Sequence, residues 1–476
     1  MREETHCDVV KFKRSKHQQH LAQLPKLPQT VADVRTLYAP SDFRTTLLDA
    51  SPTPPNVSIW WPCIWSMTDA GREILNALYQ AKQQRPSWNL RAGRLAPRTS
   101  AGASAPPPPI PTPTALGVLH LKGFVVDDTV IYSGASINDV YLHQHEKYRY
   151  DRYQLITNEA WPIPDRLHQA ASAHRRRRTA LDRSDRPKSP EIKNETRLFR
   201  FALRRAGYHF RGKAGNDELA VTPLVGLGKQ SVLNKTIHHL MSCADQKLTL
   251  CTPISTCRRC WCATSFICCA RANRWRIIVG DKTANDFYIP EDQPFKIIGA
   301  LPYLYEINLR RFLSRLQRYV DTGQLIVRLW KDGDNSYHLK GMWVDEEWQL
   351  VTGNNLNPRA WRLDLENAIL IHDPKQEMRE QRQKELECIR THTTVVGHYQ
   401  ELQSIQQYPI KVRKLIRRLR RIRIDRLISR ILRSETSNAS RHMPETYQKK
   451  AFSTPNDFSD SATYSAEPPN RAFATA

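Results

Sequence analysis

The chain has 476 residues, of which 72 are Lys or Arg and 47 are Asp or Glu, so its formal net charge at pH 7 is +25. This length is enough for roughly two or three domains, and the 40% of hydrophobic residues exclude wholesale disorder. The longest uncharged stretches are interrupted by prolines, which excludes a membrane-spanning helix there. The positive charge indicates an anionic partner, but it does not choose among nucleic acid, an anionic membrane and a phosphorylated substrate.

The first twenty residues are polar and charged, and they contain no apolar core of a secretory signal. We therefore expect a cytoplasmic protein whose 10 cysteines are free thiols. Several of these cysteines crowd together between 254 and 275. They lack the two separated ligand pairs of a structural zinc site, so we predict no metal there.

The apolar patterns alternate between helical and extended spacing along the chain. Apolar residues recur at helical spacing in 71–84, which predicts a helix. β-Branched residues fill 116–139, interrupted at Asp127 and Asp128, which predicts a β-hairpin. The later elements are predicted, in chain order, as helices and short strands over 189–252, a strand at 276–281, a helix at 305–320, a strand at 324–330 and a second hairpin at 337–355.

These patterns divide the chain into four parts. They are an N-terminal lobe over 1–187, a C-terminal lobe over 188–400, a basic amphipathic helical segment over 401–433 and a disordered tail over 434–476. Three stretches differ in composition from their flanks, namely 57–114 with many Pro and Arg, 160–186 with a run of Arg, and 254–275 with the cysteines. Such stretches suggest short pieces read in another frame, which puts a core strand of the first lobe in question.

One internal repeat carries chemical groups. Each copy reads H-L-K-G-x-x-V-D and is followed by G-x-x-Φ-N, where Φ is an apolar residue. The polar members are His120, Lys122, Asp127 and Asn138 in the first copy, and His338, Lys340, Asp345 and Asn357 in the second. A single H-x-K carries no information, but the same set of polar residues at matching spacing in two places indicates a function. We predict the His, Lys and Asp of both copies as catalytic residues.

The two copies suit phosphodiester exchange without a metal or another cofactor. A phosphate diester is an anion, so Lys122 and Lys340 can neutralise its non-bridging oxygens. One neutral histidine can attack phosphorus and form a phosphohistidine, while the other, protonated, donates to the leaving oxygen. Orienting groups are predicted at Asn138 and Asn357 for the phosphoryl oxygens, and at Asp151 and Glu366 for the imidazoles.

The chain also resembles the bacterial phosphatidylserine synthases of the phospholipase D superfamily. The resemblance rests on the paired H-x-K-x4-D motifs and on segments such as VGDKTANDFYIPEDQPFKIIGALP and HLKGMWVDEEWQLVTGNNLNPRAW. It implies an α/β fold of two phospholipase D-like lobes, each a mixed sheet flanked by helices, with one active site at the lobe interface. It also implies transfer of a phosphatidyl group from CDP-diacylglycerol to a histidine, with a slight preference for His120, and then to serine.

Two alternatives stay open at this point. The same two motifs serve other phosphodiester chemistries of the superfamily, namely those of cardiolipin synthases and nucleases. The three stretches of foreign composition allow an inactive relative that binds nucleic acid through its positive charge.

The segment 411–433 contains eleven Lys or Arg against one Asp, and its apolar residues recur near helical spacing. A basic amphipathic helix is typical of attachment to an anionic membrane, here the inner face of the cell membrane, with its apolar side inserted. The alternatives are a helix docked on the protein core and contact with ribosomal RNA. The predicted membrane-binding residues are Lys411, Arg413, Lys414, Arg417, Arg418, Arg420, Arg421 and Arg423.

Overall fold

The computed structural model describes residues 16–50, 57–60, 66–86, 89–92, 120–161, 210–253 and 274–421, together with isolated residues between 194 and 208. The predicted disordered tail lies outside the described residues, as do most of 160–186 and 254–275 and the second half of the basic segment. Within the described part, no helix is long and apolar enough to cross a bilayer.

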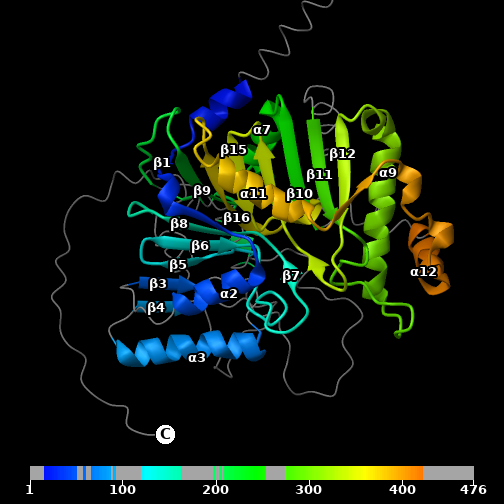
Figure 1. The fold of residues 1–476 in the computed structure, drawn as a ribbon, viewed down its shortest axis with the longest axis horizontal. Coiled ribbons are helices and arrows are strands. Elements are labelled where there is room, and N and C mark those ends of the chain that lie inside the picture. Colours follow the sequence, from blue (N-terminus) through cyan, green and yellow to red (C-terminus); the bar gives the residue numbers. More distant parts are fainter. Residues whose placement is uncertain are drawn as a thin grey trace, which may run out of the picture. The chain divides into compact units, whose positions relative to one another are not determined.

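The larger sheet has nine strands in the order β1-β9-β16-β15-β14-β10-β11-β12-β17 (Figure 1). Their bounds are Leu27–Pro28 (β1), Ala220–Leu227 (β9), Leu365–His372 (β16), Trp348–Thr352 (β15), Gly341–Val344 (β14), Lys247–Thr252 (β10), Arg274–Gly280 (β11), Leu325–Trp330 (β12) and Thr393–Val396 (β17). Strands β10, β11 and β12 run parallel, and every other neighbouring pair in this sheet is antiparallel. The sheet is therefore mixed.

The smaller sheet has six strands in the order β2-β8-β6-β5-β3-β4. Their bounds are Val34–Leu37 (β2), Tyr153–Thr157 (β8), Thr129–Ser133 (β6), Phe124–Val126 (β5), Val57–Trp60 (β3) and Asn89–Ala92 (β4). Strands β3 and β4 belong to the stretch 57–114, so this stretch does contribute strands to the sheet despite its composition. A short parallel pair, β7 (Arg149–Tyr150) and β13 (Ser336–Tyr337), joins segments that are far apart in the sequence.

The two sheets pack against each other through apolar side chains. Val130, Tyr132 and Ile156 of the smaller sheet meet Val351 and Ile369 of the larger one in a single buried cluster. These residues alternate along their strands, so one face of each strand points into the shared core. This packing fixes the ends of strands β6, β15 and β16 near one another.

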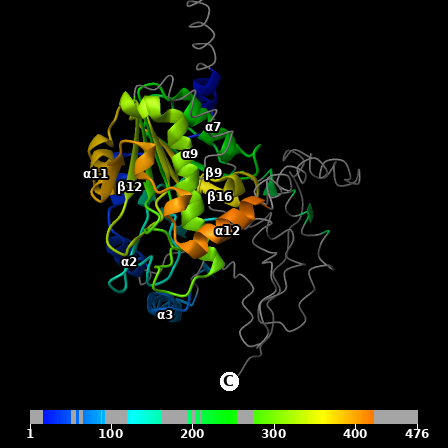
Figure 2. The ribbon, with the colours of Figure 1, turned by 90° about the vertical axis from the view of Figure 1, so that its right-hand side faces the viewer.

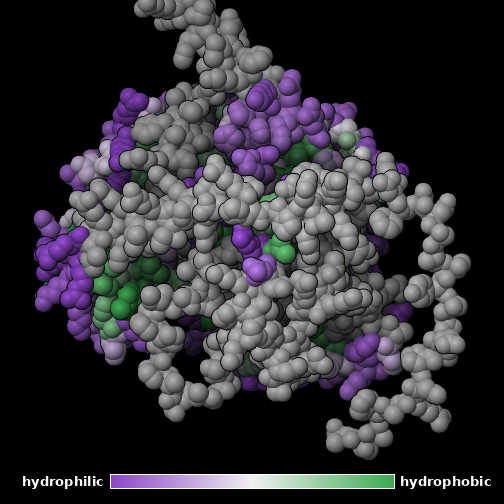
Figure 3. Space-filling view, turned by 180° about the vertical axis from the view of Figure 1, so that it is seen from behind, coloured by the Kyte–Doolittle hydropathy of each residue, from purple (hydrophilic) through white to green (hydrophobic). Residues whose placement is uncertain are grey.

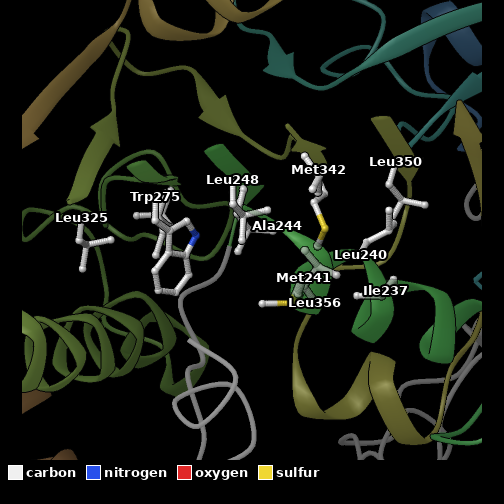
Figure 4. Close-up of a cluster of buried hydrophobic side chains, with 14 of the residues drawn as sticks. Ile237, Leu240, Met241, Ala244, Leu248, Trp275, Leu325, Met342, Leu350 and Leu356 are labelled. Atoms are coloured by element: carbon white, nitrogen blue, oxygen red, sulfur yellow. The ribbon is translucent and has the colours of Figure 1, made fainter. Parts of the chain in front are cut away.

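Helices cover the remaining faces. Helices α2 (Pro40–Asp49) and α3 (Asp69–Gln84) pack on the smaller sheet, and α7 (Val232–Cys243) and α9 (Leu301–Asp321) pack on the larger one (Figure 1). In the larger cluster, Ile237 and Leu240 of α7 lie against strand residues such as Met342 and Leu350, while Trp275 and Leu325 line the part nearer α9 (Figure 4). Helix α11 (Arg379–Arg390) contributes Leu386 and Ile389 to a further cluster.

The predicted elements agree with these bounds. The helices expected at 71–84 and 305–320 are found as α3 and α9, and the two hairpins are found as β5–β6 and β14–β15. The mixed α/β class is confirmed. In α9 the buried residues Leu309, Phe312, Leu313 and Leu316 recur at helical spacing, which is the pattern that predicted it.

The basic segment begins with helix α12 (Ile410–Arg421), which lies beside α9 (Figure 2). Val412 and Ile416 are buried against Tyr303 and Ile307 of α9. At these residues the structure therefore shows a helix docked on the protein core, which was one of the alternatives to membrane insertion. The expectation that the apolar side of this helix inserts into a bilayer is corrected for Val412 and Ile416, because side chains of α9 cover them.

Candidate active site

His120 lies just before β5, beside Glu366 of β16. The backbone amide of His120 donates to the carbonyl oxygen of Leu365 at 2.8 Å, and Nδ1 of its ring lies 2.8 Å from Oε2 of Glu366. The Glu366 side chain is 1% exposed, so the contact is shielded from water on the carboxylate side. The carboxylate that holds the first histidine therefore follows the second motif in the sequence.

His338 has the same arrangement with the roles of the copies exchanged. Its amide donates to the carbonyl oxygen of Tyr150 at 2.8 Å, and its Nδ1 lies 2.6 Å from Oδ2 of Asp151. Tyr150 precedes Asp151 just as Leu365 precedes Glu366. We call these two contacts the crossed pairs, because each histidine is held by the carboxylate that follows the other motif.

The two motif lysines are buried in the same place. Nζ of Lys340 contacts the ring of His338 and lies 3.3 Å from Oδ2 of Asp151. The backbone of Lys122 bonds to the Asn367 side chain in both directions, at 2.9 and 2.8 Å. Burial raises the pKa of Glu366, and the charges of both lysines partly offset that rise, so both lysines lie near this carboxylate.

Close packing in the motif loops requires glycine. A Cβ added to Gly134 would lie 2.8 Å from both carboxylate oxygens of Asp151, and one added to Gly353 would lie 2.6 Å from Cγ of Lys122. Both distances are below any normal contact. Gly134 therefore lets the carboxylate of Asp151, which follows the same motif, approach the loop, and Gly353 lets Lys122 of the other copy approach.

The predicted asparagines hold the turns that follow. Oδ1 of Asn138 accepts from the amide of Tyr141 at 3.0 Å, and Oδ1 of Asn357 accepts from Ala360 at 2.9 Å at the start of helix α10 (Pro358–Arg362). Their contact with phosphoryl oxygens stays a prediction. Between the second glycine and Asn357, Nδ2 of Asn354 and Oδ1 of Asn355 are buried without a hydrogen-bond partner, a feature that the sequence did not single out.

The motif aspartates stand in hairpin turns. The carboxylate of Asp345 accepts three backbone amides, from Asp245, Gln246 and Lys247, each at 2.8 Å. It stands in the β14–β15 turn with φ of 51°, and Asp127 stands in the β5–β6 turn with φ of 48°. These are positions of residues that shape hairpin turns, and the catalytic role of both aspartates stays a prediction.

The two carboxylates differ in their electrostatic surroundings. Burial acts to raise the pKa of Asp151, but the charge of Lys340 and the contact with His338 outweigh it, so this pKa lies below its ordinary value. For Glu366, burial and the nearby charge of Asp364 raise the pKa well above the ordinary value. Asp151 is therefore an ionised partner of His338, whereas Glu366 retains its proton to higher pH beside His120.

His338 and Lys340 share this strongly coupled environment. Burial, and then the charge of Lys340, hold the pKa of His338 well below its ordinary value, although Asp151 acts in the opposite direction. Burial also lowers the pKa of Lys340 to about 8. The imidazole is therefore neutral near pH 7, while most of the lysine is still charged.

Tyr141 is a site residue that sequence reasoning missed. Its hydroxyl oxygen lies 3.1 Å from Nε2 of His338, and the guanidinium of Arg149 lies 4.5 Å from the centre of its ring. Burial raises the pKa of Tyr141, so it stays a neutral phenol. Its position three residues after Asn138 is the only signal that the sequence offers.

One group of side chains in the described part of the chain has three possible metal ligands within 4.8 Å of one another. It consists of Asp69, Asp139 and His145. Asp69 and His145 are exposed, and exposed groups of this kind are common without an ion.

The fold and the crossed pairs define a phospholipase D-like protein. A family model described as cardiolipin synthase, PLD-like domain, matches residues 237–389. The chain is 60% identical over 456 residues to the CDP-diacylglycerol-serine O-phosphatidyltransferase of Escherichia coli K12, covering 89% of this chain and 100% of that protein. It is 41% identical over 460 residues to the enzyme of that name from Haemophilus influenzae, again covering 89% and 100%.

A solved structure agrees with this similarity. The crystal structure of phosphatidylserine synthase from Haemophilus influenzae matches with a TM-score of 0.78 at 40% identity, covering 87% of this chain and 99% of that chain. The chain belongs to the CDP-diacylglycerol-serine O-phosphatidyltransferase family. The resemblance stated from the sequence is confirmed.

The electrostatic surroundings of His338 can be tested by two substitutions that should shift its pKa in opposite directions. Lys340→Met removes a positive charge and should raise the pKa of His338, whereas Asp151→Asn removes a negative charge and should lower it. The pKa is measured by NMR of ¹⁵N-labelled histidine rings, with the His338→Ala spectrum identifying the signal. Shifts in the same direction for both variants would contradict the account.

Proposed function

We propose that this protein transfers the phosphatidyl group of CDP-diacylglycerol to L-serine, giving phosphatidylserine and CMP. Family membership supplies the substrate class. The observation that carries the chemistry is the set of crossed pairs, which brings two imidazoles and two buried lysines to one site. No step of the reaction as proposed needs a metal or another cofactor.

The first half-reaction forms a phosphatidyl-histidine. A neutral imidazole attacks phosphorus, a P–N bond forms, and the P–O bond to CMP breaks. The second histidine donates a proton to the leaving oxygen. Lys122 and Lys340 offset the charge on the non-bridging oxygens, and the amides of Asn138 and Asn357 are proposed to orient them.

In the second half-reaction serine takes the place of CMP. The histidine that gave up its proton now accepts one from the serine hydroxyl, and the hydroxyl oxygen attacks phosphorus. The P–N bond breaks and the first histidine is restored. The same acid-base residue therefore serves both half-reactions in opposite directions.

We assign His120 as the nucleophile and His338 as the acid-base residue. An ionised Asp151 stabilises an imidazolium on His338, which a proton donor requires. Burial and the charge of Asp364 raise the pKa of Glu366, so this carboxylate stabilises an imidazolium on His120 less than Asp151 does on His338, and a nucleophile must stay neutral. A bound phosphate diester also offsets the charge of Lys340 and so raises the pKa of His338 when the substrate is present.

We also infer the lobe organisation from the crossed pairs. The N-terminal lobe over 1–187 and the C-terminal lobe over 188–400 each supply one histidine and the carboxylate for the other. A lobe alone therefore holds no complete histidine–carboxylate pair.

The 60% identity to a named serine phosphatidyltransferase favours this function over three alternatives. These alternatives are cardiolipin synthesis, nucleic-acid cleavage and inactive binding of nucleic acid. They would use the same motifs or the same positive charge, but they are not supported by this identity.

Substitution of either histidine tests the mechanism. His120→Ala or His338→Ala alone should abolish turnover almost as fully as both together, because the residues act as one unit. Turnover is followed with CDP-diacylglycerol and labelled serine in EDTA, with separate assays of CMP and lipid. Phosphatidyl-labelled substrate should leave a covalent label on His338→Ala and none on His120→Ala.

The exposed His392 provides a control, since His392→Ala should keep full activity. A label at His338 in the His120→Ala variant would reverse the assignment of the two roles. Near-normal turnover of either single variant would contradict the two-histidine mechanism itself.

We further propose that the face around α12 contacts an anionic membrane on its cytoplasmic side. Lys411, Lys414, Arg417 and Arg418 are exposed on this helix. The apolar contribution comes from a different place, the adjoining 3-10 helix η3 (Ile297–Ala300), which contacts α12. In the view from behind, a hydrophobic patch lies beside hydrophilic side chains at the edge that α12 occupies (Figure 3).

The apolar side chains at this face are unusually exposed. Ile297 is 75% exposed, Ile298 47% and Ile410 59%. Each such side chain gains about 1.5 to 3 kcal/mol when fully buried, and each nearby basic residue gains about 1 kcal/mol at an anionic surface. Ribosomal RNA would use the same charges but not the isoleucines, so the combination favours a lipid surface.

This membrane face can be separated from the chemistry. The double variant Ile297→Ser, Ile298→Ser should bind anionic vesicles more weakly at all salt concentrations. Changing Lys411, Lys414, Arg417 and Arg418 together to Gln should weaken binding mainly at low salt, because salt screens the charges over about 8 to 10 Å. Turnover on substrate dispersed in detergent should change little in either variant.

Val395, which is 50% exposed on β17, provides the matched control, because Val395→Ser should leave vesicle binding unchanged. Unchanged binding of the isoleucine variant would move the membrane contact elsewhere. Equal loss in vesicles and detergent would show that the residues support the fold.

A further inference from the structure

The same three-residue arrangement surrounds the carboxylate of each crossed pair. The two triplets are Tyr150, Asp151 and Arg152 after the first motif, and Leu365, Glu366 and Asn367 after the second. In each triplet the first residue accepts a hydrogen bond from the amide of the other motif's histidine, and the carboxylate of the second contacts the ring of that histidine. The third residue, Arg152 or Asn367, directs its side chain to the other copy as well.

Asn367 holds the backbone of the first motif. Its Oδ1 accepts from the amide of Lys122 at 2.9 Å, and its Nδ2 donates to the carbonyl oxygen of Lys122 at 2.8 Å. The residue after Glu366 therefore fixes the motif whose histidine Glu366 contacts.

Arg152 lies against the second motif in the corresponding way. Its Nη1 would lie 2.9 Å from a Cβ added to Gly341, the residue after Lys340, so a side chain there would collide with the guanidinium. The same Nη1 donates to the carbonyl oxygen of Leu350 on β15 at 2.9 Å. The guanidinium also lies over the ring of Trp343 on β14, 4.1 Å from its centre. The glycine of the second H-L-K-G thus leaves room for Arg152.

Helix α11 holds the guanidinium from the other side. Nε and Nη2 of Arg152 donate to the two carboxylate oxygens of Glu385 at 2.5 and 2.9 Å. The two side chains are only 2% and 6% exposed. Such a two-pronged contact fixes both the position and the plane of the guanidinium. A buried ion pair stabilises a fold no better than apolar side chains of similar volume, so stability alone does not account for it.

The backbone of Arg152 sets the orientation of the neighbouring carboxylate. Its amide donates to Oδ1 of Asp151 at 2.9 Å. Oδ2 of Asp151 then faces the site, 2.6 Å from Nδ1 of His338 and 3.3 Å from Nζ of Lys340. A shift of the backbone at Arg152 would therefore turn the carboxylate away from the histidine.

We propose that Arg152 is a positioning residue for proton transfer by His338, an inference that rests on the proposed function. Its guanidinium, held by Glu385 and Leu350, fixes the amide that orients Asp151. Asp151 in turn stabilises the imidazolium that His338 becomes when it is protonated. Arg152 acts only through Asp151 and contacts neither the substrate nor the reacting atoms.

The substitution Arg152→Met should slow the first half-reaction without weakening substrate binding. The rate is that of the burst of CMP release from CDP-diacylglycerol before serine is added. At pH 7 it should fall about 10- to 100-fold, because small misplacements of groups at a site are costly. The concentration of CDP-diacylglycerol that gives half the maximal rate should stay within about twofold, since no substrate contact is lost.

The pH dependence of the burst separates positioning from a purely structural role. Asp151 acts to raise the pKa of His338, so its displacement should lower that pKa. His338 must be protonated to donate to the leaving oxygen, so the rate is lost as the pH rises through this pKa. In Arg152→Met this loss should occur about 1 pH unit or more below its position in the wild type.

Arg382→Met provides the matched control. Arg382 is also on α11 and pairs with Asp373 at 3.3 Å, and the two side chains are 2% and 0% exposed. This variant should lower the unfolding midpoint but leave the pH dependence of the burst in place. If Arg152→Met does not fold, Glu385→Gln keeps the shape of the clamp and should shift the pH dependence in the same direction. Arg152→Lys keeps the charge but not the planar fork, so it should behave like Arg152→Met.

Two outcomes would overturn the inference. One is an unchanged pH dependence in folded Arg152 and Glu385 variants whose rate follows only the folded fraction. The other is an equal shift in Arg382→Met, which would mean that any lost ion pair of α11 disturbs the site. A wild-type protein that releases no CMP would instead contradict the proposed function, so the two failures are distinguishable.

Discussion

The contact between each histidine and the carboxylate of the other copy is the constraint on which the site depends. In each crossed pair a backbone hydrogen bond and a ring–carboxylate contact act together, so a shift of one copy against the other would break both. The same displacement would separate Gly353 from Lys122. The packing of the two sheets therefore sets the geometry of the chemistry.

The site also requires that several charges be buried together. Lys122, Lys340, Asp151 and Glu366 are all less than 5% exposed. Buried charges are tolerated only where charges of opposite sign lie beside them, and the two copies meet this condition in different ways. A negative Asp151 stands beside Lys340, whereas Glu366 retains its proton more readily. A sequence repeat that is nearly symmetrical thus produces two histidines with different surroundings, as a nucleophile and a proton donor need.

The histidines and lysines could be predicted because the same polar residues recur at the same spacing. The carboxylates Asp151 and Glu366 could also be named, but their crossing could not, because sequence distance does not tell which histidine a side chain meets in space. Asp127 and Asp345 share the motif and yet stand in turns. A repeated spacing alone does not tell a residue that takes part in the chemistry from one that shapes a turn. Tyr141 reaches His338 only through the fold of its loop.

The sheets and long helices could be predicted from the spacing of apolar residues, as α9 illustrates. Periodicity does not say what covers an apolar face, however. The apolar residues of α12 were expected to meet lipid, but Val412 and Ile416 meet α9. Similarly, the composition of 57–114 obscured strands β3 and β4, because strand pairing depends on backbone hydrogen bonds that many side chains allow.

The most direct test of the account is the stereochemical course at phosphorus. CDP-diacylglycerol made chiral at its phosphatidyl phosphorus is converted to phosphatidylserine, and the configuration of the product is determined. Two successive in-line displacements, one by a histidine and one by serine, predict overall retention of configuration. Inversion would mean that serine displaces CMP directly, and it would contradict the covalent histidine intermediate.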